Sequence, residues 1–175
     1  MKVIIRVIVA LAVGVVVLVG IVGFIGSLLP RTHVVSRSIL LHRSPEEVYT
    51  VVRDFGSAPK WRSDVTQVEV RQRQGGPLHF REVGENGVVN YELVEDVPGQ
   101  RMITRIIDTN LGYSGQWTYT FTSEAGGTRV TIREDGEVSN VLFRFMSRYV
   151  FGQTATIDAY LTSLAKHFGE SAAPQ

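Results

Sequence analysis

The stretch NVLFRFMSRYVFGQTATIDAYLTSLAKHF, residues 140–168, is the longest segment with helical periodicity after the first 30 residues of the chain. Its apolar residues recur at helical intervals on either side of an interruption near the middle: Val141, Phe145, Tyr149, Ile157, Leu161, Leu164 and Phe168. Gly169 ends this pattern, and Gly152 predicts a kink, because Gly costs about 1 kcal/mol relative to Ala inside a helix. The stretch therefore predicts one long, kinked C-terminal helix.

Six segments that alternate between apolar and polar residues precede this helix, between residues 65 and 138. Short turns that contain Gly or Pro separate them, and strands joined by such turns pair antiparallel. The segment RSILL, residues 37–41, is a further strand candidate upstream. An antiparallel sheet needs its apolar face covered, and only residues 140–168 form an element long enough to cover it. The expected class is α+β, with a curved antiparallel sheet of about seven strands wrapped around the long C-terminal helix.

Residues 44–65, SPEEVYTVVRDFGSAPKWRSDV, connect the first strand to the others. Ser44 is a good N-cap, Pro45 suits the first helical position, and Glu47 completes a capping box with Ser44. A glycine and a proline then interrupt the helical pattern. The stretch therefore predicts two short helices around a corner.

Residues 7–30 contain no charged side chain. A helix of this length reaches about 36 Å, which is enough to cross the ~30 Å hydrocarbon core of a bilayer. A cleaved signal peptide would have a shorter apolar run and an A-x-A-like site, whereas this run ends in SLLPRTH. We therefore expect an N-terminal transmembrane anchor over residues 1–30, a globular domain over 31–170 and a disordered tail over 171–175.

Basic residues lie on both sides of the apolar run, so the positive-inside count is close to balanced. They are Lys2 and Arg6 before the run, and Arg31, Arg37 and Arg43 after it. The short basic tail ahead of the run favours an N-terminus inside and a domain that is extracytoplasmic.

Charge and composition exclude several classes of site. The 18 basic and 17 acidic residues are interspersed, so there is no basic stripe of the kind that binds nucleic acid. The chain has no cysteine, which excludes disulfides, thiolate metal sites and cysteine nucleophiles. The histidines, which are His33, His42, His79 and His167, lack the spacing of a metal site. We therefore expect no metal, no cofactor and no nucleic-acid partner.

The order of strand, short helix pair, antiparallel meander and long helix resembles the helix-grip fold of the START-like SRPBCC superfamily. Within it, the chain is similar to the polyketide cyclase/dehydrase and lipid-transport group. The resemblance covers residues 34–170 and rests on four stretches: residues 44–65, GQWTYTF at 115–121, GGTRVTIREDGEV at 126–138, and residues 143–170. Members bind or transform many hydrophobic molecules, so the resemblance implies a cavity between the sheet and the long helix, without naming the ligand. The opening is implied to lie near the short helix pair and the hairpin loops.

Aromatic residues provide most of the cavity candidates. Trp117, Tyr119 and Phe121 give one strand a wholly aromatic face, which packs in the core or lines the cavity. Trp61 lies at the corner between the short helices and the meander, where it closes the sandwich or forms a gate with Phe55.

Glu134 is the main polar candidate, because it is in phase with Ile132 and should point inward. A buried carboxylate needs a partner such as Arg105, or water in a cavity. Alternatively, a bulge or a strand end places Glu134 in solvent. The complete set of cavity candidates is Phe55, Trp61, Arg105, Trp117, Tyr119, Phe121, Ile132, Glu134, Phe145 and Tyr149.

Residues 141–151, VLFRFMSRYVF, are apolar nearly all round a helix. Arg144 and Arg148 are four residues apart and therefore lie on one face. Either the two arginines face solvent, or this basic and apolar surface lies on lipid headgroups near the cavity mouth.

These patterns favour a membrane-anchored, non-catalytic domain that binds or transports a hydrophobic small molecule or lipid. The sequence has no paired-carboxylate motif and no nucleophile motif, which argues against an enzyme. The first alternative is a polyketide cyclase/dehydrase-like enzyme with Glu134 as acid or base. The second is an interaction module that uses residues 141–151 to bind a membrane-protein partner.

Overall fold

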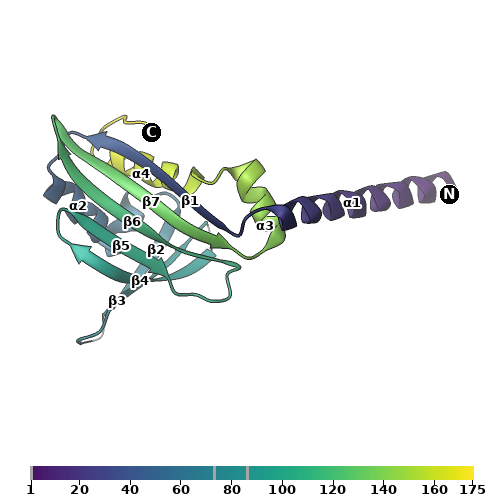
Figure 1. The fold of residues 1–175 in the computed structure, drawn as a ribbon, viewed down its shortest axis with the longest axis horizontal. Coiled ribbons are helices and arrows are strands. Elements are labelled where there is room, and N and C mark those ends of the chain that lie inside the picture. The colour runs from purple at the N-terminus through teal and green to yellow at the C-terminus, as the bar shows by residue number, and fades with distance from the viewer. Residues whose placement is uncertain (1, 73, 86) are drawn as a thin grey trace.

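The computed structural model describes residues 2–72, 74–85 and 87–175. In Figure 1, an antiparallel sheet and C-terminal helices form a domain, and one long helix projects from one end of it. The predicted α+β helix-grip class is confirmed by this arrangement.

The projecting helix is α1 (Lys2–Leu28), and it is long and apolar enough to cross a membrane. Its side chains are exposed along most of its length, but Gly26 near its end is buried against the domain. A Cβ atom at Gly26 would collide with the carbonyl oxygen of Val141. Glycine at this position therefore lets α1 pack directly on the backbone of the first C-terminal helix.

The sheet has seven strands in the order β1-β7-β6-β5-β4-β3-β2, and each neighbouring pair is antiparallel. The strands are β1 (Thr32–Leu41), β2 (Val65–Gln72), β3 (Leu78–Gly84), β4 (Gly87–Val97), β5 (Arg101–Ile106), β6 (Tyr113–Glu124) and β7 (Gly127–Val138). β1 starts directly after α1 and pairs with β7, with Val35 opposite Glu134. Because neighbours are antiparallel, the sheet end next to α1 contains the start of β1, the end of β7, the start of β6 and the β3–β4 turn.

Two short helices follow β1, as predicted: α2 (Pro45–Arg53) and the 3-10 helix η1 (Phe55–Lys60). The capping box is confirmed, because the Ser44 amide donates to Glu47 Oε2 at 2.9 Å and the Glu47 amide donates to Ser44 Oγ at 3.3 Å. This cap satisfies amides that have no partner inside the helix.

The C-terminal segment differs from the predicted single helix. It consists of α3 (Val141–Met146), the π-helical turn η2 (Ser147–Phe151) and α4 (Ala155–His167). Gly152 adopts a φ of +83°, which is not a helical conformation, so the chain breaks where only a kink was expected. α4 alone therefore lies in the grip of the sheet, while α3 packs on the end of α1.

The core fills the half of the domain far from α1. Its fully buried apolar side chains come from α4, α2, β1, β5 and β7: Ile157, Leu161, Leu164, Val48, Ile39, Leu41, Met102, Val130 and Ile132. The C-terminal residue Gln175 exchanges two backbone hydrogen bonds with Ser38, of 2.9 and 3.0 Å. The last residues thus lie along the outer edge of β1.

Candidate ligand-binding cavity

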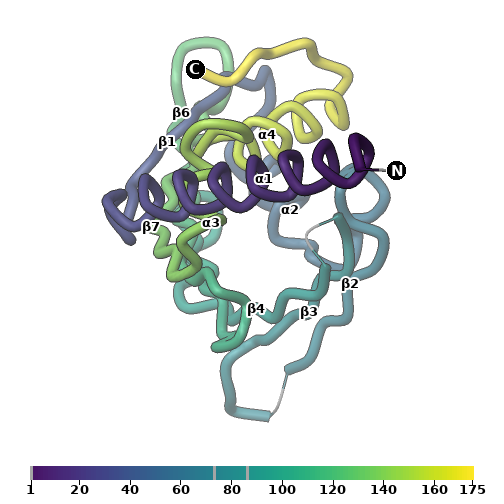
Figure 2. The backbone as a smooth tube through the Cα atoms, turned by 90° about the vertical axis from the view of Figure 1, so that its right-hand side faces the viewer, coloured from purple at the N-terminus to yellow at the C-terminus, as the bar shows by residue number. Residues whose placement is uncertain are grey.

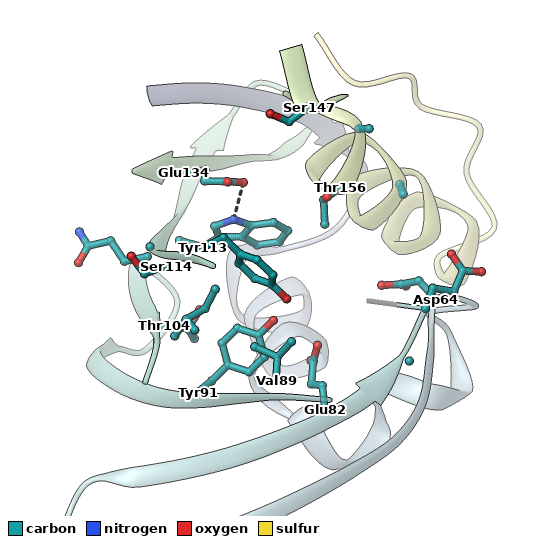
Figure 3. Close-up of a pocket in the computed structure, with 18 of the residues that line it drawn as sticks. Asp64, Glu82, Val89, Tyr91, Thr104, Tyr113, Ser114, Glu134, Ser147 and Thr156 are labelled. Carbon is teal, nitrogen blue, oxygen red and sulfur yellow. Dashed lines mark hydrogen bonds between the residues drawn. The ribbon is translucent and has the colours of Figure 1, made fainter. Parts of the chain in front are cut away.

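A cavity of about 700 Å³ lies between the sheet and the first turns of α4. Figure 3 shows side chains from several strands and from α4 pointing into it. Its volume is within the range of small-molecule sites, roughly 300–1,000 Å³.

The cavity exists because the first turns of α4 carry small side chains on the side that faces it, while Ile157 of the same turns packs in the core. Ala155, Thr156 and Ala159 line the cavity. From the following residue the helix carries Tyr160 and Leu161, which are buried in contact with the core. This change from small to large side chains along α4 explains why the space lies in the half of the domain near α1 and the core lies in the other half.

The cavity opens at the end of the domain from which α1 projects. Gly84 and Gly87 of the β3–β4 turn, Tyr113 at the start of β6 and Val138 at the end of β7 line it there. Figure 2 looks onto this end, where α1 and α3 lie in front of α4. Phe143 of α3 belongs to the rim. The β3–β4 turn and the start of β6 are therefore at the opening, whereas α2 packs on β6 and β7, and the β4–β5 and β6–β7 turns lie at the opposite end.

Glu134 is held on the cavity wall by two neighbours, and Figure 3 shows its place on that wall and one of these contacts as a dashed line. Its Oε1 lies 3.1 Å from His33 Nε2, and its Oε2 accepts a 2.8 Å hydrogen bond from Trp117 Nε1. Gly136 leaves room for the imidazole, because a Cβ atom there would lie 2.5 Å from His33 Cε1. The side chains of His33 and Glu134 are only 16% and 21% exposed. A carboxylate beside an imidazole in a cavity is able to exchange protons with a bound molecule.

A second polar group surrounds Arg62. Its guanidinium donates to Asp64 Oδ2 at 2.6 Å and to Glu82 Oε1 at 2.8 Å, and all three residues line the cavity. The guanidinium carbon also lies 5.1 Å from the centre of the Tyr160 ring, within the range of a cation–π contact. One cation thus balances two acidic side chains at a largely buried position.

Burial sets the direction of the pKa shift of the acidic and phenolic side chains near Arg62. It raises the pKa of Glu82, while the charge of Arg62 and its hydrogen bond lower it, so the carboxyl remains above its ordinary value. Burial also raises the pKa of Tyr91, Tyr119 and Tyr160, with a further contribution from nearby Glu82. These phenols therefore remain neutral and offer hydroxyl groups next to aromatic surface.

Comparisons with known proteins agree with this geometry. The profile of the family described as polyketide cyclase / dehydrase and lipid transport matches residues 32–169. The chain belongs to this family. A search of curated proteins found no match. The family and the fold are consistent with hydrophobic-ligand binding or with cyclase-type chemistry.

Solved structures share the family fold at low sequence identity. A START superfamily protein from Mycobacterium smegmatis is 16% identical, with a TM-score of 0.65, and the alignment covers 78% of this chain and 97% of that one. The Zhui aromatase/cyclase from Streptomyces sp. R1128 is 12% identical, with a TM-score of 0.64 and coverage of 79% and 94%. The di-domain ARO/CYC StfQ of the steffimycin biosynthetic pathway is 16% identical, with a TM-score of 0.61 and coverage of 78% and 50%. The chain thus spans half the length of that di-domain protein, and at these identities the likeness concerns the fold alone.

The structure places seven of the ten sequence-predicted residues of this family member in three environments. Trp117, Tyr119 and Glu134 line the cavity. Three others are buried in the core: Phe55, which stacks on Phe80 at 4.0 Å, Phe121 and Ile132. Trp61 packs edge-on against Tyr160 at 5.2 Å, behind the cavity wall rather than on it.

The remaining predicted residues lie away from the cavity wall. Arg105 is exposed and pairs with Glu92 at 2.7 Å, so it is not the partner of Glu134 that the sequence suggested. β5 directs this arginine to the outer face of the sheet, which its sequence left ambiguous because both strand phases are apolar. Phe145 and Tyr149 contact each other in α3 and η2, with ring centres 5.1 Å apart.

Sequence reasoning missed Arg62, Asp64, Glu82 and His33. A signal existed for Glu82, because it follows Leu78 and Phe80 at two-residue intervals and these three side chains share the inner face of β3. No comparable signal existed for His33, whose position depends on the pairing of β1 with β7. Among the residues that the structure describes, no group of His, Asp and Glu side chains is arranged to hold a metal ion.

Proposed function

We propose that this family member is a membrane-anchored binding or transport domain, with α1 as a transmembrane anchor and a hydrophobic small molecule or lipid as its ligand. The observation that carries the proposal is the cavity of about 700 Å³, which opens at the end of the domain where α1 leaves it. Its wall combines aromatic rings with two polar groups, around Glu134 and around Arg62. Such a lining suits an amphiphilic molecule with a few polar atoms. A tether next to the opening raises the local concentration of any ligand in the bilayer.

The test fills the cavity with one side chain. Ala159 of α4 lines the cavity, so Ala159→Trp should displace a ligand, whereas Thr162→Trp on the exposed side of the same helix should not. The full chain is purified in detergent and analysed by native mass spectrometry. We expect an added small-molecule mass in the parent chain and in T162W, and its loss in A159W. Lipids on α1 are retained equally by all three proteins and serve as an internal control. An added mass that A159W retains, or that no protein shows, would overturn the proposal.

We further propose that the N-terminus lies inside and the domain is extracytoplasmic. The short basic tail with Lys2 and Arg6 ahead of the apolar run supports this orientation. A pair of reporter fusions at the C-terminus, one active only in the cytoplasm and one active only outside it, distinguishes the two topologies. Activity of the cytoplasmic reporter alone would reverse the assignment.

A second function, an enzyme with Glu134 as acid or base, is favoured by the Glu134–His33 pair on the cavity wall. Glu134→Gln keeps the shape and a hydrogen-bond acceptor for Trp117 but removes the titratable carboxylate. If the chain catalyses a dehydration, E134Q should retain a bound molecule heavier by one water than that in the parent chain. The same bound mass in both proteins would favour binding without catalysis.

A further inference from the structure

Residues 141–151, which we call the arch, expose an unusual amount of apolar surface beside the end of α1. Tyr149, Val150 and Phe151 are 60%, 57% and 58% exposed, and Leu142 and Phe143 are also exposed. Contiguous apolar surface of this kind marks an interaction site in a folded protein. The arch belongs to α3 and η2, which lie outside the grip of the sheet.

The arch is attached to the end of α1 by two contacts. The backbone of α3 packs on Gly26, where any side chain would collide with Val141. The Arg144 guanidinium donates a 2.8 Å hydrogen bond to the carbonyl of Leu29, one of the carbonyl groups that the end of α1 leaves without a helical partner. Arg144 therefore stabilises the junction, and Arg148 is the arginine of the arch that lies at its surface. The position of the arch relative to α1 is consequently defined.

The length of α1 places the arch at a membrane surface. Arg6 is the last charged residue before the apolar run, and the helix continues from Val7 to Leu28. That segment is about 33 Å long at 1.5 Å per residue, and the hydrocarbon core is ~30 Å thick. With Arg6 at one surface of the bilayer, Gly26 lies at the other, at the depth of the headgroups. The arch packs on Gly26 and must lie at the same depth.

The chemistry of the arch fits that depth. Tyr149 and Phe151 are aromatic residues of the kind that occupy membrane interfaces, and Arg148 is positioned to approach lipid phosphates. The arch contains no acidic residue that would repel them. Phe143, Ser147 and Phe151 also line the cavity, so one structural element forms both the exposed apolar surface and the rim of the opening.

We propose that the arch lies in the headgroup layer and seats the cavity mouth on the bilayer, so that the ligand enters from lipid rather than from water. The inference rests on the proposed function for the existence of a ligand and on α1 as the anchor. It adds to the proposed function the route by which the ligand enters the cavity and the class of ligand, which is an amphiphile already present in the membrane.

The absence of native cysteine allows the depth of single positions to be measured in the full chain. Spin labels are attached to Val150→Cys and Tyr149→Cys on the arch, to Ser114→Cys on the sheet side of the rim, and to Ser123→Cys at the distant end of β6. These positions are exposed, so labels at them should not disturb folding. Each protein is placed in phospholipid nanodiscs, and collision with oxygen, which concentrates in lipid, is compared with collision with a water-soluble nickel complex.

We expect the ratio of oxygen to nickel accessibility at 149 and 150 to exceed that at 123 several-fold, with 114 also shifted toward lipid. A ratio at 149 and 150 equal to that at 123 would overturn the proposed position of the arch. Lipid contact of the label at 150 together with a water-exposed label at 114 would overturn the proposal that the cavity mouth lies on the bilayer. The A159W result is independent of these labels, so a failure of ligand binding and a failure of membrane seating are distinguishable. A chain that does not enter nanodiscs would refute both the anchor and the seating.

Discussion

Removal of the Arg62 guanidinium should destabilise the domain in a manner that depends on pH. The Arg62 side chain is only 10% exposed and contacts Asp64 and Glu82, which are 22% and 12% exposed. Arg62→Met preserves most of the packing volume but leaves two acidic side chains without their cation. The loss of one partner from a buried ion pair costs about 3–5 kcal/mol. For a domain of this size, where 1 kcal/mol shifts the midpoint by roughly 2–4 °C, the melting temperature should fall by about 6–20 °C.

The pH dependence identifies the cause. Burial already raises the pKa of Glu82, and Arg62 opposes this rise, so R62M should raise that pKa further. An acid whose pKa is higher in the folded state binds its proton more readily there. The loss of folding stability that such an acid causes is therefore fully present when the pH is above its pKa in the folded state, and it disappears as the pH falls to its pKa in the unfolded state. The stability lost in R62M should shrink on acidification, and the double variant R62M/E82Q should recover part of it at neutral pH.

Circular dichroism melting of the full chain in detergent, at several pH values, measures both effects. Arg71→Met is the control, because Arg71 is 74% exposed and its pair with Glu69 should contribute less than about 1 kcal/mol. The contrary result is an R62M chain that loses the same thermal stability at acidic and at neutral pH, with no recovery in R62M/E82Q. That result would refute an unbalanced buried charge as the cause of the destabilisation.

Three other predictions concern the anchor, a surface pair and a helix cap. Gly26→Leu should separate α1 from α3 and therefore speed amide hydrogen exchange in residues 141–151. Gly23→Leu, whose added atoms meet open space, should leave this exchange unchanged. Equal exchange rates in both variants would contradict the packing of α3 on Gly26. Burial and the hydrogen bond to Asp96 raise the pKa of Tyr49 to about 12. Asp96→Asn should therefore lower the pKa of Tyr49, which an NMR titration of labelled tyrosine measures. An unchanged pKa would exclude the Asp96 carboxylate as a cause. Ser44→Ala removes the side-chain cap of α2 and should cost about 1 kcal/mol in thermal unfolding, while Ser57→Ala, which caps no helix, should cost less.

The secondary structure was predictable where the cause is local. The capping box of α2 depends on residues three apart, and the strands depend on alternation and short turns, so both could be read from adjacent residues. The break between α3 and α4 was harder, because a glycine inside a helical pattern is compatible with either a kink or a stop. Packing on Gly26 of α1 holds α3 outside the sheet, and this contact joins segments more than 100 residues apart.

The cavity residues were predictable only as an inward-facing set. Alternation along β6 placed Trp117, Tyr119 and Phe121 on one face, but Phe121 lies in the core and the other two line the cavity. The strand itself carries no information about what lies opposite each side chain. That depends on α4, which faces one half of the sheet with Ala155 and Ala159 and the other half with leucines.

The sequence by itself determined the apolar helix, the order of the elements and the inward phase of Glu134, because each depends on composition or on spacing between neighbouring residues. Only the tertiary structure decided that His33 and Trp117, rather than Arg105, are the partners of Glu134. It also decided that Arg62 balances Glu82 and that the cavity opens beside α1. Each of these depends on the register of strands paired at a distance and on the size of side chains across the core, and pairing at a distance leaves no periodic trace in the sequence.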